Sequence, residues 1–316
     1  ASDARLVAAT LGIPFYVLNF KKDFGQVIDY FVNEYNRGRT PNPCVRCNDW
    51  LKFGKLCEYA DAIDADYVAT GHYARLHHEP QTPGDGLTPG DGHPRALPRL
   101  LRGLDHDKDQ SYVLFGSPRH RLRHMLLPIG EYTKPRVREL ARELNLPVFD
   151  KPDSQEICFV PDNDYTNLVR RRTPDQVAEG AIVDTAGQTL GQHPGQQHFT
   201  IGQRRGLNLA MGYPIYVTHK DPETNTVTVG QKADLLASGC IASQVNWLVD
   251  DAPAEWRHCQ LKVRYNGAPV AGHVRLTGDQ LEARFDEPIP AVTPGQAIVA
   301  YDQDLVLGGG WIDEAM

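Results

Sequence analysis

The chain has 316 residues, of which 41% are hydrophobic and 23% are charged, so it is long enough for two or three domains with ordinary apolar cores. Its formal net charge of −7 excludes a protein that binds nucleic acid through a uniformly basic surface, although basic runs occur at residues 119–124, 170–172 and 204–205. No apolar stretch has the length of a membrane span and the N-terminus lacks the pattern of a signal peptide, so we expect a cytoplasmic protein without membrane contact.

Along the first 70 residues the apolar spacing alternates between that of helices and that of strands. It predicts helices over residues 3–11, 23–36 and 50–63, and strands over residues 13–18 and 67–70. The expected buried face of the second helix consists of Phe24, Val27, Ile28, Phe31 and Tyr35. Helices that alternate with short apolar strands are typical of a parallel α/β layer.

Beyond this layer the composition of the chain changes twice. Residues 78–98 hold a duplicated Thr-Pro-Gly-Asp-Gly, which cannot bury a core, so we interpret them as a mobile surface insertion. After a helix expected over 134–145, short alternating runs predict a small antiparallel barrel or sandwich; they cover 215–218, 226–229, 260–264, 272–276, 280–285 and 297–301. The predicted domains are an α/β domain over 1–122, a mixed central domain over 123–210 and an all-β domain over 211–316.

The densest motif is Gly-Arg-Thr-Pro-Asn-Pro-Cys-Val-Arg-Cys-Asn at residues 38–48. We expect its two prolines to exclude a helix there, so that a helix begins near Asn48 and Cys47 lies at its N-terminus. The helix dipole, with Arg39 and Arg46, would then favour the thiolate of Cys47, as a nucleophile requires. Two alternatives stay open at this point: half of a zinc site, although no second ligand pair is evident, or plain structural cysteines.

Three further segments are candidates for chemistry. Cys158 lies in Ser-Gln-Glu-Ile-Cys-Phe-Val at residues 154–160, where it is either a small core residue or the second thiol that a sulfur carrier needs for disulfide exchange. Gly71 and His72 follow the strand expected at 67–70, where ligands of open α/β sheets bind, or are simply a strand end with a surface histidine. The polar loops at 108–112 and 199–207 are of a kind that binds phosphate or RNA backbone.

Taken together, these segments resemble the tRNA-specific 2-thiouridylase (MnmA) family over nearly the whole chain, except residues 78–98. The segments that carry the resemblance are 38–48, 69–75, 108–112, 154–160, 200–207 and 292–297, in the family's order. The resemblance implies an α/β fold with the parallel sheet of the adenine-nucleotide α-hydrolases, a mixed central domain and a C-terminal antiparallel β-barrel.

The resemblance also implies an activity, that of a tRNA-uridine 2-sulfurtransferase acting on the wobble uridine. ATP, with Mg, adenylates the uracil oxygen; a persulfide on Cys158, supplied by a sulfur-relay donor protein, delivers the sulfur; and Cys47 closes an alternate disulfide with Cys158. Asn42, Pro43 and Cys44 would line the target base and Gly71 would contact ATP. The implied tRNA contacts are His72, Lys108, Asp109, Gln110, Arg264, Tyr265 and Gln296, and no metal site in the protein is implied.

Two departures from the family pattern affect these expectations. Cys44 stands where some members carry Asp, which leaves the group that handles the proton unassigned. The family's Ser-Gly-Gly-X-Asp-Ser phosphate loop does not occur in these residues, so we expect a truncated α/β domain that binds ATP weakly or not at all. A noncatalytic tRNA-binding remnant is therefore the alternative function, and an ATP-dependent ligase or amidotransferase of the wider nucleotide α-hydrolase group, which needs no thiol pair, is a third.

Overall fold

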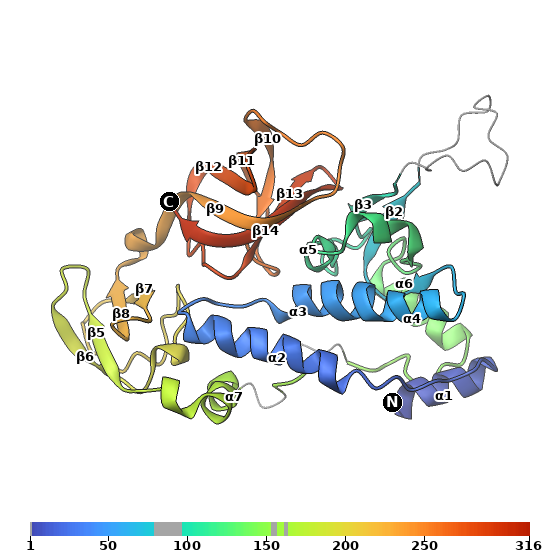
Figure 1. The fold of residues 1–316 in the computed structure, drawn as a ribbon, viewed down its shortest axis with the longest axis horizontal. Helices are drawn as coiled ribbons and strands as arrows, with labels where there is room; N and C mark the ends of the chain where they lie inside the picture. Colours follow the sequence, from blue (N-terminus) through green and yellow to red (C-terminus); the bar gives the residue numbers. More distant parts are fainter. Residues whose placement is uncertain (1, 79–96, 153–156, 161–163) are drawn as a thin grey trace.

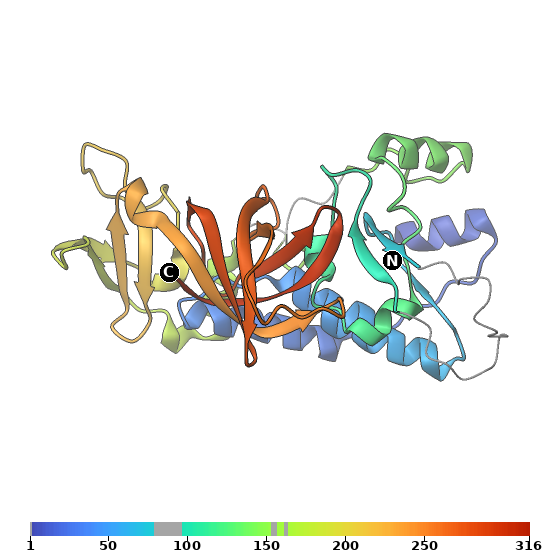
Figure 2. The ribbon, with the colours of Figure 1, turned by 90° about the horizontal axis from the view of Figure 1, so that it is seen from above.

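Three structural parts follow one another along the chain, and Figures 1 and 2 show how they are arranged. The computed structural model describes residues 2–78, 97–152, 157–160 and 164–316. Seen from above, a β-barrel lies between a small sheet of the central part and the short strands of the N-terminal part (Figure 2). None of the helices in the described residues has the length and apolar character needed to cross a membrane.

The first two expected helices are confirmed as α1 (Ser2–Leu11) and α2 (Lys21–Asn36). On α2 the predicted apolar face is buried, because Phe31 and Tyr35 pack with Val169 of α7 (Tyr165–Arg172). The strand expected over residues 13–18 was wrong. That segment pairs with no described strand, and Tyr16 and Val17 are largely exposed, because an apolar run becomes a strand only where a neighbour satisfies its backbone groups.

The second expected strand forms as β1 (Val68–Ala69), which pairs in parallel with β4 (Met125–Leu126). A hairpin of β2 (Ala74–His77) and β3 (Arg99–Arg102) follows β1. Of the insertion predicted over residues 78–98, residues 79–96 lie outside the described residues. Further helices of this part are α5 (Ser111–Leu114), η2 (Arg119–His124) and α6 (Lys134–Glu143), of which the last confirms the helix expected from residue 134.

The central part is built on a four-stranded sheet with the order β6-β5-β8-β7. Its elements are α7, η3 (Pro174–Gln176), β5 (Gly180–Val183), β6 (Thr189–His193), η4 (Gln196–His198), β7 (Tyr216–Asp221) and β8 (Thr226–Gly230). Strands from both sides of residue 210 therefore share one sheet. Their buried faces form a separate small core that includes Ile182, Val217 and Val227.

The C-terminal part is a closed antiparallel barrel of six strands, which confirms the predicted fold class. After η5 (Lys232–Leu235) it comprises β9 (Leu236–Trp247), β10 (Arg257–Lys262), β11 (Val270–Thr277), β12 (Gln280–Pro290), β13 (Ala297–Asp302) and β14 (Leu305–Ala315). The strand order is β13-β10-β11-β12-β9-β14, and the β13–β14 pairing closes it.

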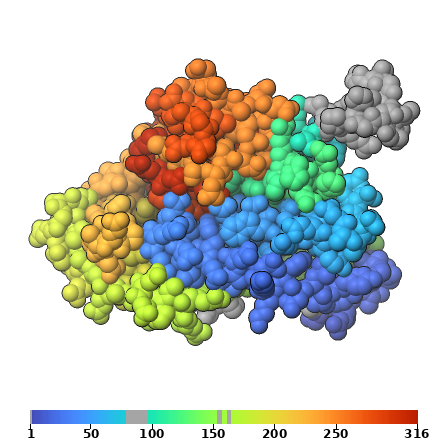
Figure 3. Space-filling model, in the orientation of Figure 1, coloured from blue at the N-terminus to red at the C-terminus, as the bar shows by residue number. Residues whose placement is uncertain are grey.

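The barrel and the N-terminal part share one apolar core. Val45, Phe53 and Tyr112 of the N-terminal part pack with Val299 and Trp311 of the barrel. In Figure 3 the barrel rests directly on the N-terminal helices. The barrel is therefore in a position to fix the loop that carries the Cys-x-x-Cys motif.

Candidate active site around Cys47 and Cys158

The proline-containing loop leads straight into a helix. This helix begins with α3 (Pro43–Arg46) and continues without interruption through η1 (Cys47–Lys55) and α4 (Leu56–Ala62). The Asn42 side chain caps it by accepting the Val45 N–H at 3.4 Å, and Pro43 occupies the first helical position. The expectation that prolines exclude a helix here was wrong, because a proline in the first turn leaves no intrahelical bond unmade. Cys44 is thus in the first turn and Cys47 lies a turn further in.

The middle of this helix, η1, is a π-helix, in which each N–H bonds to the carbonyl five residues earlier. The Leu56 N–H, for example, donates to the Leu51 carbonyl. Gly54 is adapted to this register, because a Cβ there would come within 2.9 Å of the carbonyl oxygen of Asp49. As a consequence, Lys52 lies one helical turn above Cys47.

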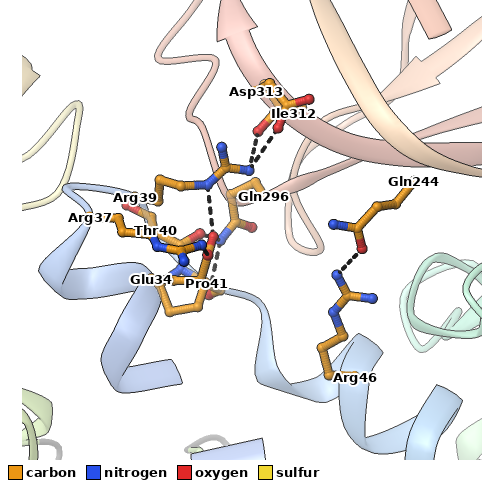
Figure 4. Close-up of polar contacts among 10 residues, drawn as sticks. All are labelled: Glu34, Arg37, Arg39, Thr40, Pro41, Arg46, Gln244, Gln296, Ile312 and Asp313. Carbon is orange, nitrogen blue, oxygen red and sulfur yellow. Dashed lines mark hydrogen bonds and ion pairs between the residues drawn. The ribbon is translucent and has the colours of Figure 1, made fainter. Parts of the chain in front are cut away.

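The segment that precedes the helix is bonded to the barrel (Figure 4). The Gln296 amide donates to the carbonyl oxygens of Thr40 at 3.0 Å and of Pro41 at 3.3 Å, and the Thr40 N–H donates to the Pro294 carbonyl at 2.8 Å. Gln296, expected from the resemblance to contact tRNA, thus holds the entrance to the cysteine motif in place.

Gly295 allows this contact, and replacing it with alanine is expected to lower the free energy of unfolding by about 2–4 kcal/mol. Its φ is +89°, and an added Cβ would lie 2.9 Å from Thr40 N and O and 3.0 Å from Arg39 Cβ. Gly278→Ala is the matched control, since Gly278 also has positive φ (+64°) but nothing within 4 Å of its Cβ position. Urea denaturation measures both; equal losses would show that backbone strain alone, and not the contact with Thr40, accounts for the effect.

Arg39 and Arg46 are not among the groups that lower the pKa of Cys47, which the sequence had suggested. Arg39 pairs with Glu34 at 2.7 Å and with Asp313 of β14 at 3.1 Å (Figure 4). The Arg46 guanidinium donates to the Gln244 side chain at 2.5 Å and lies over the Trp311 ring, 4.0 Å from its centroid. Both cations are used to join the N-terminal helices to the barrel.

The thiols of the motif have raised pKa values, contrary to the expected thiolate at Cys47. Burial raises the pKa of the Cys47 thiol; Lys52 lowers it and Cys158 raises it again. Burial likewise raises the pKa of the Cys44 thiol, with smaller contributions from Cys158 and Cys47 that also raise it and one from Lys52 that lowers it. The dipole argument failed because Cys47 is beyond the first turn, and the cation that acts on both thiols is Lys52.

Cys158 shares the electrostatic environment of both thiols of the motif. Its side chain is exposed, whereas Ile157 and Phe159 on either side pack into the core between α2 and α7. The Phe159 ring makes edge contacts with Phe24 at 5.7 Å and Phe31 at 5.2 Å. Cys158 is therefore presented to solvent by anchored neighbours and is not the core residue that its sequence also allowed. All six cysteines of the chain are free thiols.

His72 is buried, only 6% exposed, directly behind this site. Its Nε2 lies 3.3 Å from Lys52 Nζ and its Nδ1 lies 2.7 Å from Thr70 Oγ1. Since an ammonium only donates, Nε2 accepts from Lys52 and Nδ1 donates to Thr70. Burial, and secondarily Lys52, lowers the pKa of His72 to about 3, so the ring is neutral at physiological pH. Gly71, next to it, is exposed at the carboxyl end of β1.

The loop at 108–112 meets the barrel close to Cys44. The pKa of Tyr265 is raised, first by burial and then by the charges of Asp109 and Cys44, while Gln110 and Lys108 lower it. The Asp109 carboxylate is buried and accepts the N–H groups of Gly103 and Ser111, each at 3.0 Å. The structure thus places Lys108, Gln110 and Tyr265 together beside Cys44, with Asp109 as their internal support.

Arg264 is the remaining predicted residue, and it joins the barrel to the central part. Its Nη2 donates to the carbonyl oxygens of Ile201 at 3.3 Å and Ala291 at 2.7 Å, and to Thr293 Oγ1 at 2.9 Å. Sequence reasoning assigned no role to Lys52 or Thr70. Lys52 lies beyond the motif at 38–48, and Thr70, although within 69–75, was taken as the end of a strand; only the π-helical register and the contacts of His72 reveal them. Within the described residues, no group of three or more His, Cys, Asp or Glu side chains is arranged to hold a metal ion.

Three family models match successive parts of the chain. Residues 1–162 match the tRNA methyl transferase HUP domain, residues 166–231 the tRNA methyl transferase PRC-barrel domain, and residues 237–312 the aminomethyltransferase β-barrel domain. The chain is 47% identical to the tRNA-specific 2-thiouridylase MnmA of Rhodopirellula baltica over 100% of this chain and 77% of that protein. It is 48% identical to the protein of the same name from Carboxydothermus hydrogenoformans (100% and 83%) and 49% identical to that from Geobacter metallireducens (99% and 82%). The chain belongs to the MnmA family of tRNA-specific 2-thiouridylases.

Proposed function

We propose that this protein transfers sulfur to C2 of the wobble uridine of tRNA through a persulfide on Cys158 and a nucleophilic Cys47. One observation carries the proposal: an exposed Cys158 thiol, held by half-buried neighbours, lies in the electrostatic field of the Cys-x-x-Cys motif although it is distant in sequence. Two thiols brought together in this way suit disulfide exchange. The family membership supplies the acceptor, since its curated members carry the name tRNA-specific 2-thiouridylase.

The sulfur chemistry balances with these two thiols. A persulfide donor passes its outer sulfur to the Cys158 thiolate and leaves as a thiolate. The outer sulfur on Cys158 bonds to C2 of the activated uracil, and AMP leaves with the former uracil oxygen. The Cys47 thiolate then attacks Sγ of Cys158; the bond between that sulfur and the one on C2 breaks, leaving 2-thiouridine and a Cys47–Cys158 disulfide. A dithiol reductant restores both thiols, as the cytoplasm would provide.

ATP supplies the adenylate that turns the uracil oxygen into a leaving group, and Mg accompanies its phosphates. Gly71 fits a place beside the nucleotide, because it is exposed at the carboxyl end of a parallel strand and, of the residues the structure describes, only Ile129, at 3.8 Å, lies near its Cβ position. The chain's own contribution is to present the target base to the sulfur. We assign that task to Asn42, Pro43 and Cys44 in the first turn of the helix, close to Cys47.

For tRNA itself, we propose direct contacts from Lys108, Gln110 and Tyr265, which lie half-buried beside Cys44. We also propose tRNA contacts from Arg264 and Gln296, which are half-buried where the barrel meets the other parts. His72 and Asp109 are buried and bonded inside the protein, so we propose that their contribution to RNA binding is indirect. A protein that reads one folded RNA needs such scattered contacts more than a basic surface.

The test is direct. Incubation of the protein with unmodified tRNA, MgATP and glutathione persulfide is expected to produce 2-thiouridine, detected by mass spectrometry of the digested RNA. Omission of ATP, or of the persulfide, should leave the base unmodified. A tRNA that binds in a mobility-shift assay, yet gains no sulfur although MgATP also binds, would contradict the proposal. If no sulfur is gained because MgATP does not bind, the result supports the noncatalytic tRNA-binding alternative for these residues.

A further inference from the structure

The π-helix at Cys47–Lys55 has a geometric consequence for the site. In an α-helix, a residue five positions later is rotated by about 140° and points to a different face. In the i→i+5 register of a π-helix, the same residue lies on the face of the residue below it. The π-helical register of η1 therefore brings Lys52 towards the side of the helix that carries Cys47, in keeping with the effect of Lys52 on the Cys47 thiol.

Lys52 is also held from behind. His72, neutral and buried, accepts its N–H at 3.3 Å, and Thr70 fixes the orientation of the His72 ring at 2.7 Å. A carboxylate in this position would cancel the charge of the ammonium, whereas a neutral imidazole positions it and leaves the charge intact. The Phe53 ring, whose centroid is 6.0 Å from that of His72, closes the other side.

We propose that Lys52 is the cation that stabilises the thiolate of Cys47, and that His72 and Thr70 are positioning residues that hold it there. This inference rests on the proposed sulfur transfer, in which Cys47 must attack as a thiolate. Among the residues that the structure describes, the charged and titratable groups that face the two thiols of the motif are Lys52, Cys158 and, near Cys44, Tyr265. Among these, Lys52 supplies the positive charge, because Arg39 and Arg46 are bonded to the barrel side.

The experiment measures the thiol itself, without tRNA or ATP. The rate of iodoacetamide alkylation of Cys47 is followed by peptide mass spectrometry from pH 6 to pH 10. Lys52→Met is expected to move the midpoint of this profile to higher pH and to slow alkylation at pH 7.5 about tenfold. Lys52→Arg should restore most of the rate. Lys55→Met is the matched control, because Lys55 lies on the same helix, is exposed and pairs with Glu58 at 2.8 Å; its profile should coincide with that of the unchanged protein.

Three further outcomes separate the possibilities. An unshifted profile in Lys52→Met would overturn the proposal, whatever its effect on folding or on tRNA. His72→Gln should raise the midpoint by less than Lys52→Met, since the charge remains but its position is relaxed; a shift of the opposite sign would remove His72 from its assigned role. Failure of tRNA thiolation with bound MgATP and a normal Cys47 profile would contradict the proposed function and leave the role of Lys52 intact.

Discussion

Replacing Cys158 with serine is expected to abolish 2-thiouridine formation, a loss of at least about a thousandfold, and to leave tRNA affinity nearly unchanged. Serine has almost the shape of cysteine but cannot carry a persulfide, and the exposed Cys158 side chain contributes little to the core. Formation of 2-thiouridine is measured by mass spectrometry of digested tRNA, and binding by a mobility shift on the same samples.

A matched control and a second variant make this result specific. Cys259→Ala changes a cysteine that is 4% exposed in the barrel core, and should retain sulfur transfer if the fold tolerates it. Cys47→Ser should still accept one sulfur atom on Cys158, seen as added mass, but should not release it as 2-thiouridine. Equal activity in Cys158→Ser and the unchanged protein would remove Cys158 from the mechanism.

The second large effect is expected at Lys220, a 5% exposed lysine of β7. Its ammonium donates to the Phe199 carbonyl at 2.8 Å and lies 5.7 Å from the centroid of the Tyr35 ring, and no carboxylate in the described part of the chain pairs with it. Burial lowers the pKa of Lys220 to about 7, against about 10.4 in an unfolded chain.

The sign of the pH dependence follows from proton binding. Between pH 7 and about pH 10.4 the unfolded chain holds this proton and the folded protein does not, so the contribution of Lys220 to stability rises with pH. The slope is about 1.4 kcal/mol per pH unit. We therefore expect the stability of the unchanged protein to gain about 2–3 kcal/mol relative to Lys220→Met between pH 7.5 and pH 9.5.

Urea denaturation of both proteins at the two pH values measures this difference. Lys22→Met, on the exposed side of α2, serves as the control and should follow the unchanged protein in parallel. Parallel behaviour of Lys220→Met as well would mean that the buried lysine keeps its proton in the folded state.

The elements with a clear period were predictable from the sequence. The face of α2 that includes Phe31 and Tyr35 follows the 3.6-residue repeat, and the alternating runs of the barrel follow the two-residue repeat. The segment at 13–18 shows the limit of this reasoning. Its apolar run is typical of a strand, but a strand forms only where a neighbouring strand pairs with it. The start of the helix at Pro43 was not predicted. Proline is favourable at the first position of a helix, and the sequence alone did not show that Pro43 occupies this position.

What the sequence by itself determined about this protein is its family and its three-part order, and it singled out the two thiols, Cys47 and Cys158, that we propose to act; these depend on local spacing and on motifs. Only the tertiary structure decided how those residues act. Arg39 and Arg46 bond to the barrel. The π-helical register and the buried His72 direct Lys52 towards Cys47. The packing of Ile157 and Phe159 leaves Cys158 exposed to solvent. The physical reason is that charge, burial and register at a site are set by contacts between residues far apart in the chain, which no local pattern records.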